Sequence, residues 1–150
     1  MDDHAASSGF SEDVPPFLRA PLSSPCVAGL FGVHLVAWGE GTVTLAIDNR
    51  PELGHMPGWF QGAITSAIAE YAAALSGMTI APERPGATLQ QNIHFTGPAR
   101  GSRLIATGRV LSAGHTISTT AAEVSVERDG ALYHCATMTM TLAHRSPKTE

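Results

Sequence analysis

The spacing of apolar positions changes twice along the chain and predicts strands, then one helix, then strands again. Apolar residues recur at every second position over residues 33–37 and 43–47, on either side of Gly39-Glu40-Gly41, which predicts a two-stranded hairpin. The spacing then becomes three and four residues, the period of one helix face, at Ile64, Ala67, Ile68, Tyr71, Ala72 and Leu75. We therefore expect one long helix in the middle of the chain.

Beyond Ala87 the alternation of period two returns and predicts four more strands in hairpin succession, over residues 89–95, 104–111, 117–126 and 132–142. Asp129-Gly130 lies between the last two and is a strong signal for a tight turn. One long helix and about six antiparallel strands define an α+β domain in which a curved sheet wraps the helix.

The chain divides into a leader, one domain and a short tail. Residues 1–27 are rich in acidic residues, serine and proline, and we expect a loosely ordered leader with one short helical turn around Phe17 and Leu18. The domain is expected to span residues 28–145, and residues 146–150 to form the tail.

Charged residues are scarce, and the scarcity is greatest around the helix. They make up 15% of the chain, whereas an average soluble domain has about 25%. Residues 53–82 contain one formally charged side chain, Glu70, and the helix face opposite the apolar stripe has only small residues, Ser66, Ala69, Ala73 and Ser76. A helix that is weakly polar all round is usually buried all round. Because the sheet covers one side, we expect a second subunit to cover the other.

Composition excludes several classes of function. A net charge of −4 disfavours nucleic-acid binding. No apolar run approaches the ~18 residues of a membrane span. The acidic start lacks the features of a signal peptide, so we expect a cytoplasmic protein with Cys26 and Cys135 reduced. No His or Cys spacing typical of a metal site occurs, and we expect no metal.

Two residues of the central helix are candidates for chemistry. Glu70 is either an ordinary solvated glutamate or, as the lone carboxylate among alanines and serines, a general base or nucleophile. Gly62 opens the helix, where backbone amides without internal partners can polarise a carbonyl oxygen. Eight residues, about two turns, separate the two. His55 lies in the preceding loop, where a histidine is more often hydrogen-bonded or exposed than catalytic.

One stretch of the chain has arginines without acids. No acid occurs between Glu83 and Glu123, whereas Arg84, Arg100, Arg103 and Arg109 all fall in that interval. The stretch suits a small polyanion such as phosphate or pyrophosphate. The alternative is that these arginines are scattered along exposed strand edges.

Three segments together resemble the hotdog-fold acyl-CoA thioesterases of the phenylacetate-pathway (PaaI-like) type. They are Gly58-Trp59-Phe60-Gln61-Gly62 with Glu70 following, the run from Pro85-Gly86 to Asn92-Ile93-His94-Phe95, and Gly97-Pro98-Ala99-Arg100-Gly101. The resemblance covers residues 28–143. It implies a hotdog fold, hydrolysis of a small or aromatic acyl-CoA without a cofactor beyond the substrate's coenzyme A, and a homo-oligomer that is at least a dimer, with a dimer of dimers expected.

The resemblance also implies roles for individual residues. Glu70 stands at the position of the catalytic acid, as general base or nucleophile, and Gly62 at that of the amide that polarises the thioester carbonyl. Thr88 stands where some members place a hydroxyl, supplied across the dimer interface, that positions water. His55 falls where relatives have Asn or Gln near the thioester, and Gln61 replaces the common histidine. The residues expected to bind substrate or coenzyme A are Phe95, Arg100, Arg103 and His115.

Two other interpretations of the function stay open. Gly54-His55-Met56-Pro57-Gly58 looks partly like the start of acyl-carrier-protein dehydratases, which favours a dehydratase or hydratase of 3-hydroxyacyl thioesters, although the second M-P-G before the helix is missing. The other is a non-catalytic module that binds acyl-CoA. Release of free thiol, formation of an enoyl product, or neither, separates the three.

Overall fold

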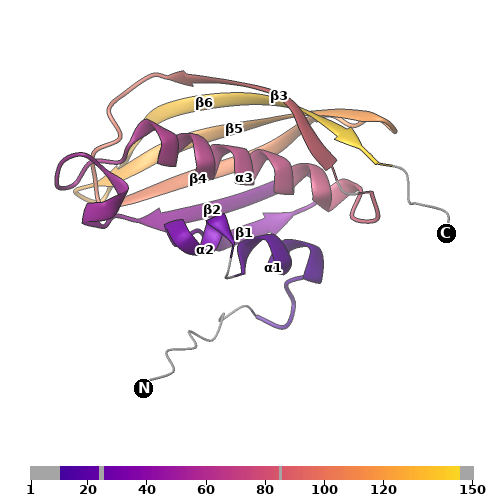
Figure 1. Ribbon diagram of the computed structural model, residues 1–150, viewed down its shortest axis with the longest axis horizontal. Coiled ribbons are helices and arrows are strands. Elements are labelled where there is room, and N and C mark those ends of the chain that lie inside the picture. Colours follow the sequence, from indigo (N-terminus) through magenta and orange to yellow (C-terminus); the bar gives the residue numbers. More distant parts are fainter. Residues whose placement is uncertain (1–10, 24–25, 85, 146–150) are drawn as a thin grey trace.

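The computed structural model describes residues 11–23, 26–84 and 86–145, and within them one long helix lies against one curved sheet. The helix is α3 (Gly62–Ile80). The strands are β1 (His34–Gly39), β2 (Thr42–Asp48), β3 (Gly86–Phe95), β4 (Arg103–Ser112), β5 (Ile117–Arg128) and β6 (Ala131–His144). Figure 1 shows the sheet curving around α3. The predicted α+β architecture is confirmed.

The strands follow the order β1-β2-β4-β5-β6-β3, and all neighbours are antiparallel. The predicted hairpins β1–β2 and β5–β6 are confirmed, the latter with positive φ at both Asp129 and Gly130. The predicted hairpin succession is wrong at one place, because β3 does not pair with β4. It pairs with β6 and forms an edge of the sheet.

The segment between β3 and β4 explains that difference, because it runs across the ends of β6 and β5 instead of turning back. The amides of Thr96 and Gly97 donate to Cys135 O, at 3.0 and 3.3 Å, and the amide of Ser102 donates to Glu127 O at 2.8 Å. Gly101 passes so close to β5 that a Cβ there would lie 2.1 Å from Glu127 O. These contacts are non-local, and period-two spacing carries no signal for them.

Small residues let α3 sit deep in the sheet. Ile64, Ile68 and Leu75 of the predicted stripe are buried. A Cβ at Gly108 of β4 would lie 1.9 Å from the carbonyl oxygen of Ala72, so the helix backbone nearly touches the strand. Such an approach requires glycine.

The expectation that a second subunit must cover the small-residue face of the helix is wrong for three of its four residues. Ala69, Ala73 and Ser76 are fully buried by the chain itself, because the sheet curves far enough around α3 to reach them. The partly exposed side of the helix includes instead Ala67, Glu70, Tyr71 and Ala74.

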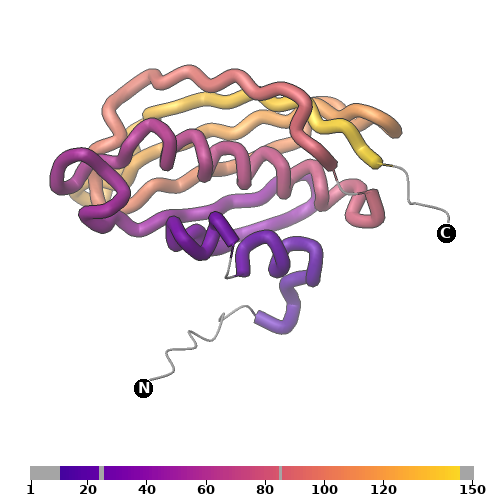
Figure 2. The backbone as a smooth tube through the Cα atoms, in the orientation of Figure 1, coloured from indigo at the N-terminus to yellow at the C-terminus, as the bar shows by residue number. Residues whose placement is uncertain are grey.

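Part of the expected leader packs on the domain. Helix α1 (Pro16–Leu22) contains the predicted turn around Phe17 and Leu18, and α2 (Val27–Phe31) follows it. Leu18 and Leu22 of α1 are buried, so this part of the expected leader is not loosely ordered, and Ala28 at the start of the expected domain is buried as well. Both helices lie on the side of α3 away from β3 (Figure 2). Residues 1–10 and the tail, 146–150, lie outside the described residues, and the domain boundaries stay predictions.

Two further features bear on function. Helix α3 is long and apolar enough to cross a membrane by length and composition alone, a test that the core helix of a soluble protein also passes. A short 3-10 helix, η1 (Pro51–Leu53), leads into the loop before α3.

Candidate active site

Glu70 and Thr88 lie together on one side of α3. The hydroxyl of Thr88, near the start of the edge strand β3, is 3.5 Å from Glu70 Oε1 and 3.8 Å from Met140 Sδ. Glu70 is half-buried, so its carboxylate is accessible to water and to a ligand. The resemblance implies a hydroxyl supplied across a dimer interface, whereas here Thr88 is beside the Glu70 of its own chain.

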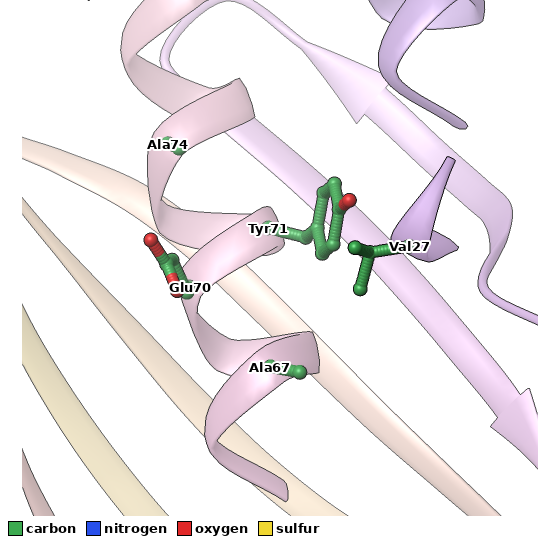
Figure 3. Close-up of a pocket in the computed structure, with 5 residues that line it drawn as sticks. All are labelled: Val27, Ala67, Glu70, Tyr71 and Ala74. Carbon is green, nitrogen blue, oxygen red and sulfur yellow. The ribbon is translucent and has the colours of Figure 1, made fainter. Parts of the chain in front are cut away.

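A pocket of about 340 Å³ lies on the exposed side of α3 at Glu70. Its walls are Val27, Ala67, Tyr71 and Ala74, and Glu70 is the one charged side chain that lines it. In Figure 3 the side chains of Glu70 and Tyr71 leave the helix in opposite directions, and the Tyr71 ring lies near Val27. The apolar surface of the pocket is therefore on the Tyr71 and Val27 side, and Glu70 lines its edge with its side chain pointing the other way.

Tyr71 contributes its ring to the pocket, and its hydroxyl is used elsewhere. The hydroxyl accepts a hydrogen bond from the amide of Ala28, at 3.2 Å, which ties α2 to α3. Burial raises the pKa of Tyr71 above its usual value, and the Ala28 hydrogen bond opposes that effect. Val27 reaches the pocket because of this tie. Sequence reasoning missed Val27, since the leader was expected to be loosely ordered.

The start of α3 forms a second group of candidate residues. The carbonyl of Gln61 accepts from the amides of Ile64 and Thr65. Within the described residues, the amides of Gly62 and Ala63 donate no hydrogen bond to a backbone carbonyl, as expected at a helix N-terminus. The ring of Phe95 covers Gly62, with Cζ 3.4 Å from where a Cβ would be. These free amides can bind a carbonyl oxygen next to an aromatic ring.

His55 belongs to the same end of the helix. Its Nδ1 lies 3.2 Å from Gln61 Oε1, and its ring centroid is 6.0 Å from that of Trp59. Gln61, which stands where the family commonly has a histidine, is therefore hydrogen-bonded to His55 of the preceding loop. The pair can orient a group bound at the helix start.

The two groups are too far apart to act together within one chain. Gly62 and Glu70 are eight residues apart on one helix, about 12 Å at 1.5 Å per residue. The base must hydrogen-bond the water that attacks the carbonyl carbon, and the amide must hydrogen-bond the oxygen of that same carbonyl, so both groups must converge on one thioester. In a single chain the two groups of candidate residues therefore lie at different points along α3.

The residues expected to bind coenzyme A do not gather either. Arg100 is exposed and pairs through its backbone with Trp59, near the helix start. Arg103 donates to Asp48 Oδ1 at 2.7 Å, and this hydrogen bond raises its pKa. His115 lies in the turn after β4, and the ten residues of that strand, about 33 Å, separate it from the Arg103 end. Arg100 and His115 of one chain cannot bind the same phosphate.

Metal ligands are not gathered in the described part of the chain, where no three His, Cys, Asp or Glu side chains could hold an ion together. Cys26 and Cys135 are both free thiols.

The fold of one long helix wrapped by a curved six-stranded antiparallel sheet is that of the hotdog proteins, and comparison with known families agrees. The model of the thioesterase superfamily matches residues 59–133, half of the chain, and this chain belongs to that superfamily. No match was found among curated proteins.

Solved structures share the fold. A thioesterase family protein from Silicibacter pomeroyi is 24% identical over 85% of this chain and 95% of that chain, with a TM-score of 0.81. A thioesterase from Haemophilus influenzae is 18% identical over 85% and 89%, with a TM-score of 0.74. The PaaI protein of E. coli, from the phenylacetic acid degradation operon, is 15% identical over 79% and 83%, with a TM-score of 0.70. The hotdog fold is confirmed.

Proposed function

We propose that this protein hydrolyses the thioester bond of a small or aromatic acyl-CoA. The observation that carries the proposal is the placement of Glu70, with the Thr88 hydroxyl beside it, at the wall of an apolar pocket. An acyl group fits against apolar walls, and a carboxylate at its edge can activate water. Membership of the thioesterase superfamily supports the same reaction class.

The reaction needs one proton transfer to the base and one to the leaving group. Glu70 takes a proton from a water that Thr88 orients, and the oxygen of that water attacks the thioester carbon. The Gly62 amide hydrogen-bonds the oxyanion that forms. The carbon–sulfur bond then breaks, the coenzyme A thiolate takes up a proton, and the products are a carboxylic acid and free coenzyme A. Direct attack by Glu70, followed by hydrolysis of the anhydride, is the alternative order.

The separation of Gly62 from Glu70 leads us to propose a homodimer in which two chains complete each site. One edge of β3 is paired with β6, and the other has no neighbour among the strands of the described residues. If two copies of β3 pair antiparallel with the two-fold axis between Gln91 and Asn92, Thr88 lies opposite the partner's Phe95. Since Phe95 covers Gly62 within each chain, Glu70 then faces the partner's Gly62.

The proposal also covers the oligomeric state and the cellular location of the protein. We expect two such dimers to associate into a tetramer, in the cytoplasm, with neither nucleic acid nor membrane as a partner. Light scattering on the purified protein measures the assembly, and a monomer would contradict it.

The test is an assay of a panel of acyl-CoAs that records free thiol and enoyl product separately. The proposal predicts thiol release by the wild type. It also predicts that Glu70→Gln reduces this release by about 100-fold or more, because the substitution removes the base from the reaction. Glu40→Gln is the control, since Glu40 is an exposed glutamate in the turn between β1 and β2. An enoyl product would indicate the dehydratase, binding without turnover the non-catalytic module, and full activity of Glu70→Gln would remove Glu70 from the mechanism.

A further inference from the structure

The first residue of α2 reaches the pocket at Glu70. The lining residues are Val27 of α2 and, from α3, Ala67, Glu70, Tyr71 and Ala74. Figure 3 shows the side chain of Val27 beside the Tyr71 ring. Val27 is 51% exposed, so part of its side chain is free to contact a ligand. A helix that precedes the sheet in the sequence therefore forms one wall of the same pocket as the candidate base.

The contacts of the next residue, Ala28, hold Val27 in place. The amide of Ala28 donates to the hydroxyl of Tyr71 at 3.2 Å, and its carbonyl oxygen accepts from the amide of Val33 at 2.8 Å. Ala28 itself is fully buried. Both backbone groups of Ala28 are therefore used, one by α3 and the other by the segment that leads into β1. Val27 is thereby a fixed wall of the pocket.

Small side chains connect Glu70 with this wall. Ala67 and Ala74 each lie three or four residues, about one helical turn, from both Glu70 and Tyr71. Their methyl groups keep the helix surface low, so that a hydrocarbon chain can lie across it. Consecutive side chains leave a helix about 100° apart, which makes the path from Glu70 to Tyr71 at least about 9 Å long at the radius of a helix with its side chains. An extended octanoyl chain spans that path, and an acetyl group does not.

The far part of the pocket has little to offer a polar group. Apart from the Glu70 carboxylate, the one polar side-chain group of these lining residues is the Tyr71 hydroxyl. Its oxygen already accepts from the Ala28 amide, and burial raises the pKa of Tyr71, as expected of a hydroxyl removed from water. A polar substituent that is buried without a partner loses its hydrogen bonds to water. An acyl group that ends in such a substituent is therefore disfavoured here.

We propose that Val27 and the Tyr71 ring form the far wall of the acyl site and select hydrocarbon acyl groups, without polar substituents, that are long enough to reach them. The inference rests on the proposed thioesterase function, in which the thioester lies at Glu70. The acyl chain then crosses α3 over Ala67 and Ala74 and ends against Val27. Helix α2, at the junction of the expected leader and the expected domain, is thereby a specificity element of the enzyme.

Substitution of Val27 tests the proposal through the ratio of kcat/KM for octanoyl-CoA to kcat/KM for acetyl-CoA. Val27→Phe fills the far end of the pocket and should lower this ratio about tenfold, with hydrolysis of acetyl-CoA nearly unchanged. Leu30→Ala is the matched control and should keep the wild-type ratio, because Leu30 is a 68% exposed residue of the same helix and does not line the pocket. A wild-type ratio in Val27→Phe would overturn the proposal.

The polarity of the wall is tested with 8-hydroxyoctanoyl-CoA, which differs from octanoyl-CoA by one terminal hydroxyl. The wild type should hydrolyse it with a kcat/KM about tenfold or more below that for octanoyl-CoA. Val27→Thr has nearly the shape of valine and adds a hydroxyl to the wall, so it should reduce this difference by supplying a hydrogen-bond partner. Equal or better hydrolysis of the hydroxylated substrate by the wild type would contradict the proposal.

A binding measurement separates a failure of this proposal from a failure of the thioesterase function. S-octyl-CoA and S-ethyl-CoA are thioethers, which a thioesterase does not hydrolyse, and calorimetric titration measures their affinity without turnover. Val27→Phe should weaken binding of S-octyl-CoA about tenfold and leave that of S-ethyl-CoA unchanged, whether or not acyl-CoA is hydrolysed. No binding of S-octyl-CoA to the wild type would overturn the proposal. If Val27→Phe binds both thioethers as the wild type does while acyl-CoA is hydrolysed, the protein is a thioesterase whose acyl site lies elsewhere.

Discussion

Replacing Gly108 by alanine should destabilise the protein more than any conservative change on the surface of the sheet. The added Cβ would lie 1.9 Å from the carbonyl oxygen of Ala72 and 2.2 Å from its carbonyl carbon. A normal contact distance between such atoms is above 3 Å, so helix and strand must separate by more than 1 Å, and no flexible side chain can absorb the change. Overpacking of this kind costs about 1–3 kcal/mol, and we expect the upper end because both obstacles are backbone.

Urea unfolding followed by circular dichroism measures this effect. A loss of about 3 kcal/mol corresponds to a drop in Tm of about 6–12 °C for a domain of this size. Gly39→Ala is the control, because its Cβ would meet the Thr42 methyl group at an ordinary 3.5 Å, and it should change stability by less than about 1 kcal/mol. If Gly108→Ala unfolds within about 0.5 kcal/mol of the wild type, α3 does not sit on β4 as described.

Three further outcomes follow from buried or hydrogen-bonded groups. Burial opposes ionisation of Glu123, but hydrogen bonds from Thr137 and His134 outweigh it and hold the pKa of this carboxyl below 4.5. Glu123→Gln should therefore lower the stability near pH 7, by under about 1 kcal/mol because the side chain is 43% exposed. The loss should shrink progressively as the pH falls below 4.5. Chemical denaturation at several pH values measures it, and a loss that does not depend on pH would contradict this. Burial raises the pKa of the Cys135 thiol to about 11, so mass spectrometry should find it unmodified by iodoacetamide at pH 8 in the folded protein and alkylated after unfolding; rapid native labelling would refute its burial. Tyr71→Phe removes the acceptor that ties α2 to α3 and should cost about 1 kcal/mol in urea unfolding, together with faster amide exchange at α2; unchanged exchange would show that the bond does not hold α2.

The elements of the fold were predictable from the sequence where the signal is local. The spacing of residues 64–75 gave the helix, and Asp129-Gly130 gave the turn before β6, because both depend on neighbours in the chain. The pairing of β3 with β6 depends on residues more than 40 positions apart. No local pattern distinguishes that arrangement from a hairpin with β4.

The candidate site was likewise predictable only where the signal is local in the sequence. Glu70 stood out because it is the one charged residue of its region, and the structure places it at a pocket. Arg103 was expected to bind substrate, but its partner Asp48 is 55 residues away in sequence and only adjacent in the sheet.

The central claim is that Gly62 of one chain and Glu70 of the other act on the same thioester, and complementation between two inactive variants tests it most directly. Glu70→Gln removes the base. Gly62→Pro removes the amide hydrogen at the first helical position, which tolerates proline, and the extended backbone of Gln61 suits a following proline. Gly62→Ala keeps the amide and serves as the control for the side chain.

The two variants are co-expressed with different tags, and acyl-CoA hydrolysis is measured on the mixture. Each mixed dimer has one site with both groups intact, so a random mixture of otherwise inactive chains should recover about a quarter of wild-type activity. The contradicting result is a mixture as inactive as either variant alone while mixed dimers are present, which would mean that both groups must come from the same chain.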